Sequence, residues 1–146
     1  MPKITPNIED YLEAILEISN KNGFARVKDI AAHLEVKNPS VTQQIQKLSG
    51  MKLVSHKSYG NVTLTDKGRE IAERTLKRHK MFVKLLGEIL HLPKSVSEDD
   101  ACKMEHAINP RTMKRLSILI DYINEKELAE DLAAYIKEKC MLEDNC

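Results

Sequence analysis

Three residues of types that bind metal ions stand close together in the second half of the chain: Cys102, Glu105 and His106. In an α-helix, residues three and four positions apart share one face, so a helix here would place the thiol, the carboxyl and the imidazole side by side. Sulfur, oxygen and nitrogen ligands that converge on one point suit a divalent transition metal. The spacing therefore indicates a metal site on this helix.

The same stretch has an interpretation without a metal. Ser97 and Asp100 have the spacing of a capping box, which would place acidic residues in the first turn of a helix beginning at Ser97. A cysteine on such a helix is commonly inert packing. A capping box accounts for Asp100 but not for the three metal-binding residue types, so both interpretations stay open at this point.

Composition sets the broad class of the protein. The chain has 146 residues, of which 42% are hydrophobic and 31% charged, as expected for one globular domain or two small ones. No apolar run reaches the length of a membrane span, and the start of the chain lacks the apolar core of a signal peptide. We therefore expect a cytoplasmic protein without membrane contact. Three cysteines without a Cys-x-x-Cys motif do not predict a disulfide framework.

Charge is distributed unevenly along a chain whose formal net charge is only +1. Residues 36–65 contain no Asp or Glu. The lysines of this segment are Lys37, Lys47, Lys52 and Lys57. Such a basic segment favours a surface that faces a polyanion such as DNA. The alternative is a solvated lysine face, although solvated faces usually mix both signs of charge.

The first half of the chain has the pattern of a winged helix-turn-helix. A helix over residues 6–21 is followed by two short helices at 27–34 and 38–48, and the second of these has a polar outer face without acids. Two strand-like segments, 53–57 and 62–65, flank a turn and form the expected β-hairpin wing.

The remainder reads as helices, so the fold class is mainly α with a small β-hairpin wing. A long helix is predicted over 66–91, followed by three helices at 97–108, 110–123 and 127–139. The apolar second half of the long helix predicts contact with another subunit. We expect a DNA-binding domain at residues 1–66 and a helical metal-binding and dimerisation domain at 67–146.

Residues 7–123 resemble the diphtheria-toxin-repressor family of metal-dependent transcriptional repressors. The matching segments are Glu9-Asp10-Tyr11-Leu12-Glu13, Asn38-Pro39-Ser40-Val41-Thr42-Gln43, Leu64-Thr65-Asp66-Lys67-Gly68, Arg78-His79 and Glu105-His106. The resemblance implies a homodimer that binds a palindromic operator in double-stranded DNA and represses metal-uptake genes. It also implies a metal ion between the two domains, held by Asp10, Glu13, His79, Cys102, Glu105 and His106.

On DNA, the second helix of the helix-turn-helix is expected to read the bases. Ser40, Thr42 and Gln43 are expected to reach base edges, with Pro39 making apolar contact. The residues expected at the DNA backbone are Lys47, Lys57 and Tyr59.

The identity of the metal stays open between Mn²⁺ and Fe²⁺, with other divalent ions possible in vitro. Asp10 resembles the manganese-responsive branch of the family, whereas Cys102 resembles the iron-responsive branch. Carboxylates suit Mn²⁺, while a thiolate favours softer ions. The iron branch's ancillary site is incomplete, since Val83 and Glu98 stand where a glutamate and a histidine are expected.

Three other functions remain as alternatives. A winged-helix regulator could respond to a signal other than metal, or the metal could be purely structural. A metallohydrolase would need a catalytic motif, and the chain has neither His-Glu-x-x-His nor a phosphate-binding loop. A catalytic metal also needs an open coordination position, whereas the ligands expected here saturate the ion. We therefore expect a regulator and not an enzyme.

Overall fold

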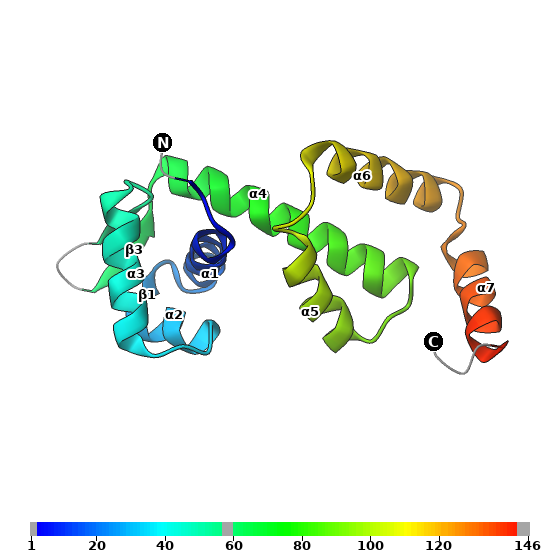
Figure 1. Ribbon diagram of the computed structural model, residues 1–146, viewed down its shortest axis with the longest axis horizontal. Coiled ribbons are helices and arrows are strands. Elements are labelled where there is room, and N and C mark those ends of the chain that lie inside the picture. Colours follow the sequence, from blue (N-terminus) through cyan, green and yellow to red (C-terminus); the bar gives the residue numbers. More distant parts are fainter. Residues whose placement is uncertain (1–2, 57–59, 143–146) are drawn as a thin grey trace. The chain divides into compact units, whose positions relative to one another are not determined.

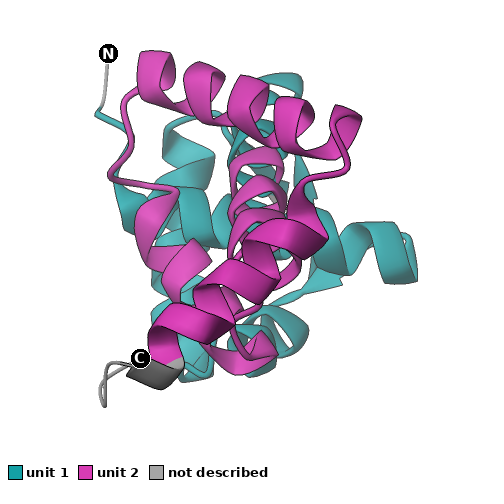
Figure 2. Ribbon diagram, turned by 90° about the vertical axis from the view of Figure 1, so that its right-hand side faces the viewer, with its two compact units in different colours: residues 1–76 teal, residues 77–146 magenta. Residues whose placement is uncertain are grey.

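The computed structural model describes residues 3–56 and 60–142, which form two compact units (Figures 1 and 2). The N-terminal unit comprises residues 1–76 and the C-terminal unit residues 77–146, so the boundary falls inside a long helix. The fold is mainly helical with one small antiparallel sheet, as the sequence predicted. No helix within the described ranges is long and apolar enough to cross a membrane.

Three helices build most of the N-terminal unit: α1 (Pro6–Asn22), α2 (Val27–His33) and α3 (Asn38–Gly50). Proline opens α1 and stands in the first turn of α3, where its missing N–H costs no helical hydrogen bond. Gly23 ends α1 in the left-handed conformation at φ 80°, and its N–H donates to the Ser19 carbonyl at 2.8 Å. These bounds agree closely with the helices that the sequence predicted.

A three-stranded sheet completes this unit, with the strand order β1-β3-β2. The hairpin strands β2 (Val54–His56) and β3 (Asn61–Leu64) match the predicted wing, and Ser55 pairs with Thr63. Strand β1 (Ala25–Arg26) pairs with β3 and was not predicted, because two residues are too few to show a period of two. The tip of the wing lies outside the described residues, and with it Lys57 and Tyr59.

The core of the N-terminal unit unites the helices with the wing. Every element of the unit contributes buried side chains. They are Ile8, Leu12 and Ile15 of α1, Ala25 of β1, Ile30 of α2, Val41, Ile45 and Leu48 of α3, Leu53 and Val54 at the start of the wing, Val62 of β3 and Ala72 of α4. One continuous core of this kind holds α3 firmly, with its polar face directed outward.

The predicted single helix over residues 66–91 is wrong in its last turns. The α-helix α4 (Asp66–Val83) continues as the π-helix η1 (Lys84–Ile89). Its wider turn is visible in the Leu90 N–H, which donates to the carbonyl of Leu85, five residues earlier, at 2.9 Å. Apolar spacing alone does not reveal this change, because Leu85, Leu86, Ile89 and Leu90 suit either geometry.

Three further helices complete the C-terminal unit: α5 (Lys94–Met104), α6 (Pro110–Glu125) and α7 (Ala129–Leu142). Its apolar clusters centre on Phe82, Leu86 and Ala101 and on Ile89, Ile120 and Ile123.

The predicted capping box at Ser97 is wrong, because α5 begins three residues earlier than expected. Ser97 is buried inside the helix, and its hydroxyl is within hydrogen-bond reach of the carbonyls of Leu92 and Pro93 at 3.3 and 3.1 Å. Asp100 therefore lies in the middle of α5 and not in its first turn. A helix cap does not explain the acidic residue at this position.

Candidate metal centre and nucleic-acid interface

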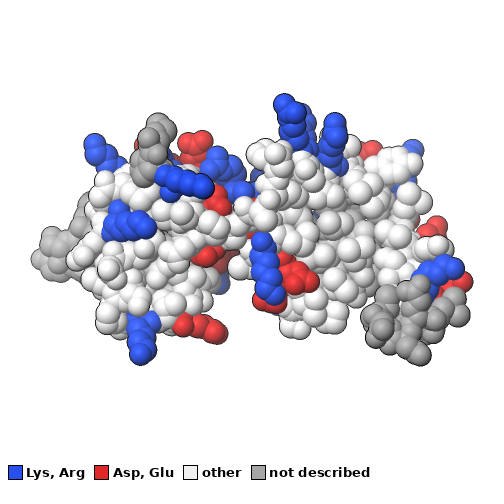
Figure 3. All heavy atoms as spheres, in the orientation of Figure 1, with Lys and Arg blue, Asp and Glu red and all other residues white. Residues whose placement is uncertain are grey.

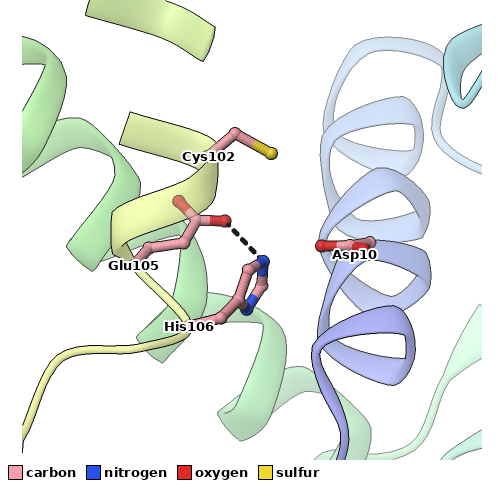
Figure 4. Close-up of side chains that lie close together, drawn as sticks. All are labelled: Asp10, Cys102, Glu105 and His106. Carbon is pink, nitrogen blue, oxygen red and sulfur yellow. Dashed lines mark ion pairs between the residues drawn. The ribbon is translucent and has the colours of Figure 1, made fainter. Parts of the chain in front are cut away.

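The end of α5 brings three candidate ligands together within the C-terminal unit. Cys102 lies on the last turn of α5, Glu105 caps it with helical backbone angles (φ −60°, ψ −29°), and His106 follows in the turn. Because the backbone stays helical at Glu105, the predicted three- and four-residue spacing still holds. One ligand atom from each of the three residues lies within 4.8 Å of the other two. Figure 4 shows the three side chains grouped at the end of α5.

Glu105 is the buried centre of this cluster. Its side chain is 1% exposed, and its Oε1 lies 3.2 Å from Nε2 of His106, which is 10% exposed. Cys102, in contrast, is exposed. A carboxylate held away from water needs nearby positive charge or hydrogen-bond donors. The Glu105 position is therefore suited to a cation.

Helix α4 supplies a fourth candidate ligand and holds Glu105 in two ways. Nδ1 of His79 lies 2.8 Å from Oε2 of Glu105, and the other ring nitrogen, Nε2, lies 3.1 Å from Oε2 of Glu98. The neighbouring Arg78 donates from Nη1 to the backbone carbonyl of Glu105 at 2.9 Å. Both the side chain and the main chain of Glu105 are thus tied to α4.

Two of these contacts were missed by sequence reasoning. Arg78 stood in a family signature without an assigned role, and Glu98 was noted only as an unexpected residue at an ancillary position. A signal for Glu98 does exist, because Glu98 and Glu105 are seven residues apart and two helical turns place them on one face. No local pattern marks Arg78, because its contact is with a different helix.

The other two predicted ligands belong to the N-terminal unit. Asp10 and Glu13 lie on α1, both partly buried and three residues apart, so they share one face of the helix. The adjacent Glu9 is also buried, at 9% exposure, and was not singled out from the sequence. That Asp10 and Glu13 join the ligands of the C-terminal unit stays a prediction.

The donor set of the C-terminal unit fits a divalent transition metal. Thiol, carboxylate and imidazole side chains are the groups that bind such ions, and each can be oriented by a partner outside the metal's own ligands. The hydrogen bonds of His79 and the main-chain anchor at Glu105 already provide such orientation. This arrangement can hold an ion in a fixed position relative to α4 and α5.

Helix α3 presents the predicted DNA-reading residues to solvent. All five described members of that set are exposed, whereas Val41, Ile45 and Leu48 on the opposite side are buried. The exposed residues are Pro39, Ser40, Thr42, Gln43 and Lys47. The hydroxyl of Thr42 donates to the Asn38 carbonyl at 3.1 Å, which leaves its oxygen available chiefly as an acceptor.

The positive charge of the N-terminal unit is dispersed on the face seen in Figure 3. Lysine and arginine side chains stand apart from one another there, with acidic side chains between some of them. A uniformly basic patch is therefore absent from the described residues on this face. Sequence-independent attraction to phosphates would come from individual lysines, and discrimination among sequences from the polar face of α3.

Two family models match this chain over most of its length. The N-terminal DNA-binding domain of iron-dependent repressors matches residues 3–62, and the metal-binding and dimerisation domain of the same repressors matches residues 65–134. These descriptions agree with the winged helix-turn-helix and with the ligand cluster beyond it.

Similar proteins include two helix-turn-helix transcriptional regulators, both named MntR. The regulator MntR of Oceanobacillus iheyensis is 34% identical over 135 residues, covering 92% of this chain and 91% of the relative. MntR of Shouchella clausii is 36% identical over 131 residues, covering 87% of this chain and 88% of the relative.

Solved structures of similar fold include the manganese regulator SloR, with a TM-score of 0.71 and 28% identity, and IdeR of T. acidophilum, with a TM-score of 0.68 and 28% identity. The matches cover 82% and 80% of this chain and 55% and 54% of those chains, so this chain spans just over half of their length. The two family matches and the curated relatives together establish that the chain belongs to the iron-dependent repressor family, also called the diphtheria-toxin-repressor family, of metal-dependent DNA-binding transcriptional regulators.

Proposed function

We propose that this regulator represses metal-uptake genes when its candidate centre holds Mn²⁺ or Fe²⁺. The observation that carries the proposal is the convergence on buried Glu105 of a thiol, two imidazoles and a main-chain anchor from two helices. The proposed ligands are Asp10, Glu13, His79, Cys102, Glu105 and His106. When bound, the ion supplies positive charge that offsets the carboxylates.

The proposed switch acts through α1. Asp10 and Glu13 would complete the ligand set, so binding of the ion would fix the N-terminal unit relative to the C-terminal one. In a homodimer, the two α3 helices would then be held about one DNA turn apart, roughly 34 Å, as a palindromic operator requires. A coupling of about 1–3 kcal/mol changes DNA affinity roughly 5- to 150-fold, which metal ligation can supply.

The donor chemistry favours two metals for different reasons. Carboxylate oxygens suit Mn²⁺. The similar protein SloR is described as a manganese regulator, and another similar structure is a manganese-dependent repressor in complex with manganese. The thiol of Cys102 favours a softer ion such as Fe²⁺. Structures of the similar protein ScaR contain Zn²⁺ or Cd²⁺, so binding of several divalent ions in vitro is expected.

The test is an equilibrium titration of the full chain with Mn²⁺ and with Fe²⁺ under anaerobic conditions. His106→Ala should abolish saturable binding because it removes a ligand, whereas His33→Ala should not. His33 is a matched control, because its Nε2 pairs with Oε2 of Glu17 at 3.4 Å and neither residue is a proposed ligand. Comparing Cys102→Ser for the two ions would show which of them depends on the thiol.

Measurements of operator binding distinguish the proposed metal switch from a purely structural metal and from a regulator with another signal. The proposal expects chelation to weaken DNA affinity and the ion to restore it. A purely structural metal would raise the stability of the fold without changing the DNA affinity of the folded protein. Tight DNA binding that neither chelator nor metal alters would indicate a regulator with another signal, and absence of any metal binding would overturn the proposal.

The proposed reading of DNA by α3 makes a separate prediction. Gln43→Ala should reduce binding to the operator more than to random DNA, since a lost base contact costs about 1–3 kcal/mol of discrimination. Lys47→Ala should weaken binding to all sequences and lower the salt slope by about one, as for one lost phosphate contact. Fluorescence anisotropy over a salt series measures both, and equal losses by Gln43→Ala on both DNAs would refute base reading.

A further inference from the structure

We propose that Glu98 is a positioning residue for the metal centre, an inference that rests on the proposed function. Its carboxylate accepts a hydrogen bond from the Nε2–H of His79 and thereby directs the opposite nitrogen, Nδ1, toward Glu105. Glu98 thus acts on the ion through His79 and is not itself a ligand.

The two ring nitrogens of His79 lie next to different carboxylates. The two nitrogens of an imidazole face in different directions, so they cannot serve the same neighbour. Nδ1 lies 2.8 Å from Oε2 of Glu105, and Nε2 lies 3.1 Å from Oε2 of Glu98. A histidine that ligates a metal through one nitrogen carries its proton on the other, and the acceptor of that proton fixes the tautomer and the ring plane.

Burial assigns different roles to the two carboxylates. Glu105 is 1% exposed and lies in the cluster with Cys102 and His106, whereas the side chain of Glu98 is 46% exposed. An ion bound at Glu105 would be held where His79 offers Nδ1. The half-exposed carboxylate on the far side of the ring is then left to accept the hydrogen bond from Nε2.

The fold of α5 explains why Glu98 can reach His79. Glu98 and Glu105 are two turns apart on one face of the segment, so both meet the side of α4 that carries His79. The preceding Ser97 is buried and hydrogen-bonded to the carbonyls of Leu92 and Pro93, which fixes the start of α5.

The acidic neighbours of Glu98 face a different partner. Asp99 and Asp100 both pair with Lys103, and the hydrogen bond that the Lys103 ammonium donates to Asp99 raises the pKa of Lys103. The same helix therefore offers a matched control: Asp99→Asn removes one negative charge beside Glu98 without removing an acceptor from His79.

Metal affinity and the tautomer of His79 together test this role. Loss of a carboxylate that orients a ligating histidine typically costs about 10- to 100-fold in metal affinity. Glu98→Ala should raise the dissociation constant for Mn²⁺ by this factor with the number of ions per chain unchanged. The dissociation constant of Glu98→Gln should lie between those of the unchanged protein and Glu98→Ala, because the glutamine amide oxygen still accepts a hydrogen bond. The dissociation constant of Asp99→Asn should stay close to that of the unchanged protein.

Imidazole ¹⁵N chemical shifts give a readout that does not depend on bound metal. In the metal-free chain, Glu98→Ala should alter the His79 tautomer distribution, while Glu98→Gln should largely preserve it. Circular dichroism and the amide NMR spectrum confirm that each variant remains folded. An unchanged tautomer distribution in Glu98→Ala would show that Glu98 does not set the His79 tautomer, and would contradict the proposal.

Three outcomes of the Mn²⁺ titration would also overturn the proposal, and each has a different meaning. Glu98→Ala with unchanged Mn²⁺ affinity refutes a positioning role while leaving the proposed function intact. Loss of a full equivalent of Mn²⁺ in Glu98→Ala would make Glu98 a ligand. A wild-type chain that binds no ion would overturn the proposed function and this inference with it.

Discussion

At the scale of single residues, the candidate centre depends on Arg78 as much as on the ligands. Its guanidinium donates to the Glu105 carbonyl at 2.9 Å, at the point where α5 ends and its last carbonyls lack helical partners. The bond fixes the main chain from which Glu105 and His106 extend. Loss of Arg78 should therefore displace two proposed ligands together.

Arg78→Met should lower both stability and metal affinity. A hydrogen bond from a charged donor contributes about 1.5–3 kcal/mol, so we expect the free energy of unfolding to fall by about that amount. Chemical denaturation of the metal-free chain and Mn²⁺ titration measure the two effects. Arg74→Met, one turn earlier on α4 and exposed, is the control, and equal behaviour of the two variants would contradict the role of Arg78.

The spacing of the candidate ligands could be predicted from the sequence, but the residues that contact those ligands from another helix could not. Cys102, Glu105 and His106 lie close together because they are neighbours along one helical segment, and helical periodicity is a local property of the sequence. The contacts of Arg78 and Glu98 join α4 to α5 across many residues of chain. Such contacts depend on how the helices pack, which a single sequence does not encode in any local pattern.

At the scale of elements, the junction between the wing and α4 depends on a close approach of backbone. Thr65 Oγ1 lies 2.8 Å from the Lys52 carbonyl and accepts from the Gly68 N–H at 3.1 Å. A Cβ added at Gly68 would lie 2.0 Å from the carbonyl oxygen of Leu53. Since that oxygen belongs to the backbone, a side chain at position 68 would force the wing and α4 apart.

Gly68→Ala should therefore destabilise the N-terminal unit, by at least the 1–3 kcal/mol typical of overpacking. Gly50→Ala is the matched control, because a Cβ at the end of α3 meets nothing within 4 Å and alanine is the better helix former. We expect Gly50→Ala to be neutral or stabilising by up to about 1 kcal/mol. Thermal unfolding measures both, and a stable Gly68→Ala protein would contradict the packing at this junction.

The elements themselves were predicted with uneven success. The start and end of α1 follow from Pro6 and Gly23, whose conformational preferences act locally. The π-helix after Val83 and the early start of α5 at Lys94 were not predicted. The apolar residues of the π-helix would suit a regular α-helix equally well, so the amino-acid pattern does not distinguish the two. The expected start of α5 at Ser97 rested on a capping-box spacing that the structure does not use.

At the scale of the whole molecule, the C-terminal unit has an exposed apolar face on α6. Ile118, Leu119 and Tyr122 are 58%, 48% and 53% exposed, while Ile120 and Ile123 on the same helix are buried. The matched family domain is a dimerisation domain, and an exposed apolar face is the usual surface for such contact. We therefore expect α6 to contribute to the homodimer.

Leu119→Asp should convert the dimer to a monomer and weaken operator binding, because it places a charge in an apolar interface. Ser117→Asp adds the same charge at an exposed polar position of α6 and should leave the dimer intact. Sedimentation velocity distinguishes the two forms. If Leu119→Asp remains dimeric, the interface lies elsewhere.

The different exposure of Cys102 and Glu105 determines which of the two residues can change during evolution of the metal site. Glu105 is buried and anchored at both its main chain and its side chain, so almost any replacement would disturb the fold. Cys102, in contrast, is exposed, so a replacement of similar size there does not disturb a packed core. A lineage could therefore change its preferred metal by mutation at position 102 while the inherited scaffold stays intact.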